Sequence, residues 1–287
     1  MEFENPTESI CGKRQSVQGF SVYEKYGVVL FHTGIAAVYD LEAKKSAPLG
    51  AFRLGSYDAG CDKRYINHAN DCVFGQKIEG ERFPLLYVTA GNSGETDEKG
   101  FISYCAVEQF YEKNGEFSAK TVQRIYYKND GIESTLFETP GWGRPAYLPD
   151  GENGFLYLFS ARQRTRKGFS GADNRYIVTK FRLPDPGCGD VTLCPKDIID
   201  QFLLPFDVYF TQGGTIYKNI LWYTFGCGNA EHPNALRAVD LERKEFVLSE
   251  DLSDTQFLDD EVECCGFFSG RLLINTQSGK IYERIQE

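Results

Sequence analysis

Residues Asn67–Gly91, NHANDCVFGQKIEGERFPLLYVTAG, decide the fold that this sequence predicts. A polar leader runs into an apolar strand, a turn follows, and a second strand, Leu85–Gly91, reads apolar-apolar-aromatic-apolar-Thr-small-Gly. Related stretches recur 52 to 70 residues apart: VVLFHTG (Val28–Gly34), FLYLFSA (Phe155–Ala161), ILWYTFG (Ile220–Gly226) and LLINTQS (Leu272–Ser278). Repeats of this size, each built around a hairpin, are typical of a β-propeller.

Each repeat accommodates a four-stranded antiparallel meander, so the sequence predicts an all-β, five-bladed β-propeller that forms one domain over residues 1–287. The predicted innermost strands are Gly19–Glu24, Ala69–Phe74, Arg144–Leu148, Val208–Thr211 and Val262–Phe268. The fifth repeat ends one strand short, and we expect an N-terminal strand near Cys11–Val17 to close the last blade and remove the open edges. Only Val107–Lys113 and Pro195–Phe202 favour helix.

The sequence contains 41% hydrophobic and 14% aromatic residues, which is enough apolar material to fill the spaces between neighbouring sheets. A formal net charge of −10 gives no general attraction to nucleic acid or anionic lipid. No apolar run has the length of a membrane-spanning helix. We therefore predict no nucleic-acid partner, no membrane span and a monomer.

The compartment is left open by the sequence. Nine cysteines without disulfide-framework spacing or a C-x-x-C pair indicate reduced thiols, which favours the cytoplasm. The first 17 residues lack the pattern of a signal peptide, although Met1 would also fit a start codon placed before a mature secreted segment. No cofactor is indicated, and we assign no metal.

The mouth of the central channel is where we expect a ligand. In a meander, the start of the first strand and the link between the second and third strands lie at one end. Three of these links are long, at Asn92–Gly100, Arg162–Arg175 and Cys227–Asn234, and long loops of this kind often carry function. They would form a wall along one side of the mouth.

The leader Asn67–Asp71 holds the densest polar cluster before any predicted strand. His68, Asn70 and Asp71 could bind a hydroxylated ligand or a metal, or shuttle a proton. The alternative is that these side chains cap the strand entry and bond one another.

The H-A-N-D step before an apolar strand resembles the inner strands of uncharacterised bacterial propellers and of lactonase-like propellers, over about eight residues. The resemblance implies that His68, Asn70 and Asp71 face a ligand. Lactonase-like propellers have six blades and a metal held by carboxylate and Asn ligands, whereas five repeats are counted here, so that metal is not carried over.

Aromatic and basic residues occur at other places around the predicted mouth. Trp142 beside Arg144 could stack a sugar ring and pair with an anion, or could pack between blades. Tyr209 precedes the fourth innermost strand. Arg162 begins a loop with five basic residues, which would attract an anionic ligand or remain solvated.

Carboxylates precede three of the innermost strands, and Asp71, Asp207 and Glu261 would then share one channel. Five-bladed propeller glycosidases use three such carboxylates, and this set resembles theirs in type and number. The sequence thus predicts a ligand-binding propeller for a small polar or anionic, carbohydrate-like molecule. The alternatives are a glycoside hydrolase that uses these three carboxylates and a protein-interaction scaffold.

Overall fold

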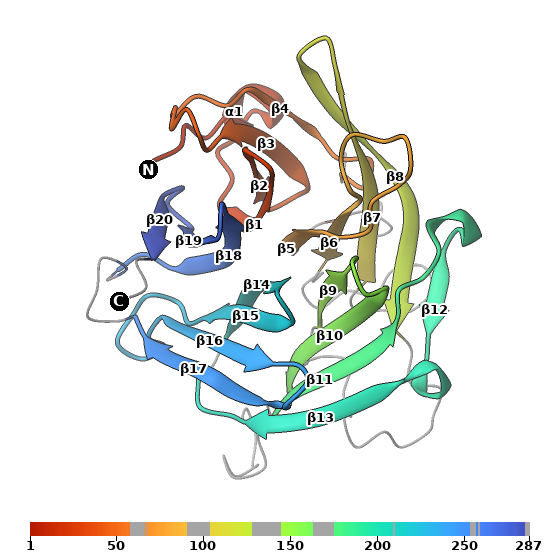
Figure 1. The fold of residues 1–287 in the computed structure, drawn as a ribbon. Helices are drawn as coiled ribbons and strands as arrows, with labels where there is room; N and C mark the ends of the chain where they lie inside the picture. The colour runs from red at the N-terminus through yellow and green to blue at the C-terminus, as the bar shows by residue number, and fades with distance from the viewer. Residues whose placement is uncertain are drawn as a thin grey trace.

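The computed structural model describes residues 1–57, 66, 68–90, 104–127, 145–162, 175–208, 210–252, 257 and 259–284, with the main chain alone at 161 and 162. Its strands form five sheets around a common centre, which confirms the five-bladed β-propeller (Figure 1). No helix in these ranges is long and apolar enough to cross a membrane. The eight cysteines in these ranges are free thiols, as predicted.

Each blade is a meander whose first strand lies nearest the centre (Figure 1). Blade one contains β1 (Val17–Tyr23), β2 (Tyr26–Phe31), β3 (Ile35–Asp40) and β4 (Gly50–Arg53). Blade two contains β5 (Ala69–Phe74), β6 (Leu86–Ala90), β7 (Tyr104–Lys113), β8 (Glu116–Tyr127) and the added parallel strand β12 (Val191–Leu193). Blade three contains β9 (Ala146–Asp150), β10 (Phe155–Arg162), β11 (Arg175–Arg182) and β13 (Asp200–Pro205).

Blade four contains β14 (Thr211–Tyr217), β15 (Ile220–Phe225), β16 (Ala235–Asp240) and β17 (Glu245–Asp251). Blade five contains β18 (Val262–Phe268), β19 (Arg271–Thr276) and β20 (Ile281–Arg284). The helical elements are α1 (Thr7–Cys11) and two 3-10 turns, Pro186–Cys188 and Pro195–Asp197.

Tight hairpins join the first two strands of blades four and five. Lys218 and Asn219 have φ values of 52° and 62°, and Ser269 and Gly270 have values of 50° and 77°. Positive φ at both central residues is the signature of a type I′ turn, whose twist matches that of the flanking strands. The meanders are therefore specified by local turn chemistry.

Apolar side chains fill the wedge between each pair of neighbouring blades. The described residues contain five buried clusters, one for each wedge. Representative residues, from the wedge of blades one and two round to that of blades five and one, are Leu30 and Val88, Tyr87 and Leu158, Phe159 and Phe225, Leu236 and Ile274, and Leu273 and Phe31. Inner strands such as β2 and β6 are therefore buried on both faces, whereas the outer strand β17 alternates between exposed and half-buried residues.

The N-terminal segment closes blade five, as predicted, but with Met1–Phe3 in place of Cys11–Val17. The Phe3 N–H donates to the Gly279 carbonyl at 2.9 Å, and the Ile281 N–H donates to the Met1 carbonyl at 2.7 Å. The N-terminus accordingly lies beside β20 (Figure 1). The predicted closing segment instead forms the end of α1, a connection and the start of β1.

Three further predictions about elements were wrong. Val107–Lys113 continues strand β7, because pairing with β8 along its whole length outweighs local helix propensity. Pro195–Phe202 divides into a 3-10 turn and the start of β13. The innermost strand of blade four begins at Thr211 rather than at Val208.

The innermost strands approach so closely that the main chain fills the centre of the ring. A Cβ atom placed on Gly19 would lie 2.6 Å from the Cys72 nitrogen, and one on Gly213 would lie 2.8 Å from the Glu263 carbonyl oxygen. Cβ atoms do not tolerate such separations, so these two positions require glycine.

A carboxyl and a thiol complete this centre, and we call Asp71, Gly213, Gly214 and Cys264 the axis cluster. Asp71 is 0% exposed. Its Oδ1 accepts from the Cys264 thiol at 2.9 Å, and its Oδ2 accepts from the Gly214 N–H at 2.8 Å. These bonds join blades two, four and five across the centre.

Replacing Gly213 with alanine tests this close approach. We expect Gly213→Ala to lower the free energy of unfolding by about 1–3 kcal/mol or more, because the new methyl group would overlap the Glu263 carbonyl oxygen and the Cys264 sulfur of blade five. Urea denaturation measures the change. Gly187→Ala, on an exposed turn where the methyl group would meet only the Asp185 side chain, is the control with a small expected effect. Equal effects of the two substitutions would contradict the packing described.

Candidate functional site

Four of the five innermost strands carry a β-bulge at their start. The register shifts fall between Val17 and Phe20 in β1, Ala69 and Asp71 in β5, Thr211 and Gly214 in β14, and Val262 and Cys264 in β18. The polar residues within these bulges are Gln18, Asn70, Gln212 and Glu263. A bulge re-aims the side chain of its extra residue. Four blades therefore carry a polar residue at equivalent positions, at the end of the strands that we call the mouth.

The links between second and third strands lie against these leaders, as expected for a meander. His32, at the end of β2, packs edge-on against His68 with 4.5 Å between ring centroids. Gln277, in the link of blade five, donates through Nε2 to Glu261 Oε2 at 2.8 Å. The mouth thus gathers residues from neighbouring blades.

Glu261 is the centre of the best-defined part of this mouth. Its Oε1 accepts from Gln212 Nε2 at 2.5 Å, in addition to the bond from Gln277. Burial raises the pKa of the Glu261 carboxyl, while hydrogen bonds from Gln212, Cys227 and Gln277 act to lower it. No ion pair joins Glu261 to a Lys or Arg among the described residues.

Glu263 lies two residues further along the same leader and is 3% exposed. Burial, followed by the charge of Glu261, raises its pKa well above the ordinary glutamate value. The Gln277 Nε2 lies 3.4 Å from its Oε1, a long hydrogen bond. Two carboxyl groups with raised pKa values therefore share Gln277, and we call Glu261, Glu263, Gln212 and Gln277 the carboxyl–amide corner.

The histidine pair lies at the junction of blades one and two. The His32 carbonyl accepts the Ala69 N–H at 2.8 Å, which fixes the leader of blade two against the end of β2. Burial lowers the pKa of His32, and the charge of Lys13 lowers it further. Both effects favour the neutral form of the His32 imidazole.

Asp71 lies below the mouth rather than on it. The bulge at Asn70 turns the Asp71 side chain into the axis cluster, where burial raises its pKa to about 7 despite three hydrogen bonds that act to lower it. The carboxyl is enclosed by main chain and by the Cys264 thiol. Its evident role is to hold the centre together.

Asp207 connects blades three and four through an ion pair with a buried arginine. Its Oδ2 accepts from Arg237 Nε at 3.0 Å and Nη2 at 2.8 Å, and its Oδ1 accepts from the Tyr176 hydroxyl at 3.1 Å. The Arg237 side chain is 8% exposed and the Asp207 side chain 43%. Asp207 thus neutralises a buried guanidinium at the edge of the mouth.

The predicted residues Trp142, Arg144 and Tyr209 lie outside the described residues, as does the Arg162 side chain. The long links at Asn92–Gly100 and at 163–174 lie outside them too. The third long link is described. Asn234 Nδ2 donates to the Phe257 and Asp260 carbonyls at 2.9 and 2.8 Å, which attaches this link to blade five.

Sequence reasoning missed Gln212, Gln277, His32 and Cys227. Amides belong to no catalytic motif, so only the position of Gln212 before two glycines and of Gln277 directly after a repeated strand could have indicated them. Within the described ranges, no group of three or more His, Cys, Asp or Glu is arranged to hold a metal ion.

Comparison with solved structures finds distant similarity. A glutaminyl cyclase from Myxococcus xanthus aligns with a TM-score of 0.49 and 12% identity, covering 94% of this chain and 89% of that chain. A glycosyl hydrolase from Bacteroides ovatus aligns with a TM-score of 0.47 and 11% identity, covering 94% and 84%. No protein-family model matches the sequence, and no curated protein matches it. The propeller assignment rests on the sheets and clusters of the structure itself.

The titration of Asp71 predicts how stability depends on pH. Its folded-state pKa of about 7 exceeds the unfolded value of about 3.9. The stabilisation from its bound proton is therefore complete below about pH 4 and is lost as the pH rises to about 7. Asp71→Asn should flatten the decline in unfolding free energy between these pH values, as measured by urea denaturation. The exposed control Asp259→Asn should keep the wild-type slope, and an unchanged slope in Asp71→Asn would refute the assignment.

The Asp207–Arg237 pair predicts unequal costs for two similar substitutions. Asp207→Asn should lower the free energy of unfolding by about 1–3 kcal/mol, because it leaves a buried guanidinium without its charged partner. Asp200→Asn, which breaks the exposed pair with Lys244, should cost less than about 1 kcal/mol. Denaturation curves of both variants measure the difference, and equal losses would rule out a special role for Asp207.

Proposed function

We propose that this propeller binds a small, neutral, polyhydroxylated molecule of carbohydrate type at its mouth. The observation that carries the proposal is the Glu261 carboxyl, half-buried, oriented by two amides and without an ion-pair partner among the described residues. Paired carboxyl and amide groups accept and donate hydrogen bonds in the pattern that sugar hydroxyls need.

The charge of this corner favours a neutral ligand over an anionic one. Asp260, Glu261 and Glu263 lie within four residues of one another, and among the described residues Lys280 approaches Asp260 at 3.9 Å. An anion placed here would be repelled. An anionic ligand would depend on the basic residues that begin at Arg162, whose side chains are not described.

Glycoside hydrolysis is the second candidate, favoured by the raised pKa values of Glu261 and Glu263. A carboxyl that keeps its proton near neutral pH can act as a general acid beside an ionised neighbour. The predicted set of Asp71, Asp207 and Glu261 is less suited to this role, because Asp71 is enclosed and Asp207 neutralises Arg237. Both candidate functions, sugar binding and glycoside hydrolysis, would use Glu261.

A panel of monosaccharides, disaccharides and linear polyols tests the proposal, first by thermal shift and then by calorimetry. For a sugar that binds, we expect Glu261→Gln and Gln212→Ala each to weaken affinity about tenfold, because each loses a hydrogen bond in a partly buried site. Glu242→Gln, on an exposed turn, is the control and should leave affinity unchanged.

Product analysis after incubation with disaccharides separates binding from hydrolysis. Cleavage that disappears in Glu261→Gln would make the protein a hydrolase. A panel without any binder, or binding that is indifferent to both mouth variants, would refute the proposal and favour a protein-interaction scaffold.

A further inference from the structure

A buried amide in the seam between blades one and five has no hydrogen-bond partner among the described residues. Asn275, near the end of β19, is 1% exposed. Neither its Oδ1 nor its Nδ2 makes a hydrogen bond within the described part of the chain. Buried polar groups in folded proteins are nearly always bonded to protein or to an ordered water.

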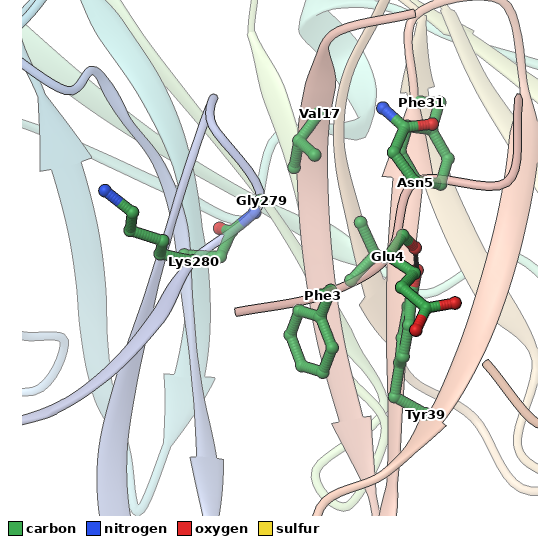
Figure 2. A pocket seen from close by; sticks show the side chains of 10 residues that line it. Phe3, Glu4, Asn5, Val17, Phe31, Tyr39, Gly279 and Lys280 are labelled. Carbon is green, nitrogen blue, oxygen red and sulfur yellow. Dashed lines mark hydrogen bonds between the residues drawn. The ribbon is translucent and has the colours of Figure 1, made fainter. Parts of the chain in front are cut away.

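The Asn275 side chain borders a small cavity that the N-terminal segment covers. The lining residues come from both sides of the seam, Gly279 and Lys280 from blade five and Val17, Phe31 and Tyr39 from blade one, with Phe3 between them (Figure 2). The cavity measures about 10 Å³. This is close to the smallest space that admits one water molecule.

Several polar groups of the N-terminal segment have partners within the protein. The Glu4 N–H donates to the Ser46 carbonyl at 3.0 Å, and the Glu4 carbonyl accepts from the Tyr39 hydroxyl at 2.6 Å. The Asn5 amide donates to the Gln15 carbonyl at 2.7 Å. In contrast, no described residue donates to the Phe3 carbonyl. The Phe3 carbonyl oxygen lies 3.6 Å from a Cβ atom placed on Gly279, which also lines the cavity, so the Asn275 amide and the Phe3 carbonyl are two groups at this seam without a partner among the described residues.

We propose that one buried water molecule occupies this cavity and is a fixed part of the ring closure. The water accepts from Asn275 Nδ2, donates to Asn275 Oδ1 and donates its second proton to the Phe3 carbonyl. Three hydrogen bonds are the usual number for an internal water. The water links blade five to the segment that replaces its missing strand, and it explains an amide in an otherwise apolar seam.

A high-resolution crystal structure of the full chain tests the site directly. We expect electron density for a single water within hydrogen-bond distance of both Asn275 side-chain atoms. An empty cavity, or a rotated Asn275 side chain bonded to protein atoms, would overturn the proposal.

Asn275→Leu provides a second test, because leucine has the same branched arrangement of side-chain heavy atoms as asparagine and no polar atoms. If the water is present, the melting temperature should fall by roughly 2–4 °C, since the Phe3 carbonyl and the water lose their partners. If the amide is unpartnered in a dry cavity, leucine should raise the melting temperature or leave it unchanged, which would contradict the proposal. Asn234→Leu removes a buried amide that has three protein partners, and it calibrates the loss for an amide bonded to protein.

Discussion

The close approach of the innermost strands at the centre of the ring is the constraint on which the rest of the structure depends. Five blades leave a narrow axis, and here the axis is filled by glycine main chain and by the Asp71 carboxyl bonded to Cys264. An acid in this position is costly to ionise, and its raised pKa reflects that cost. Water does not reach the buried Asp71 carboxyl, so its hydrogen bonds are made to the Cys264 thiol and the Gly214 N–H of other blades. These bonds hold the blades in register.

Because the axis is filled, it limits where a ligand could bind at the mouth. Asp71 is fully buried beneath the mouth, so the ligand of the proposed function would be held by bulge residues and links near the surface. The four bulges place polar residues just before the strands reach the axis cluster. The proposed binding residues therefore lie next to residues of the axis cluster, with Gln212 before Gly213 and Asn70 before Asp71.

The blade count and most hairpins could be predicted from the sequence because alternating apolar patterns and turn residues act locally. The position of Glu261 directly before an innermost strand could also be predicted. The inward turn of Asp71 could not, because a bulge shifts the side-chain alternation by one residue and has no reliable sequence signal. Closure by Met1–Phe3 depends on pairing with residues about 280 positions away, for which the sequence contains no local pattern.

A double-mutant cycle between Asp71 and Cys264 tests the central claim most directly. The two residues are 193 positions apart in sequence and belong to blades two and five. Unfolding free energies of Asp71→Ala, Cys264→Ala and the double variant should give a coupling energy of about 1 kcal/mol or more, because the residues share a buried hydrogen bond. Additive effects, with a coupling near zero, would mean that the blades do not meet at a common axis through this pair.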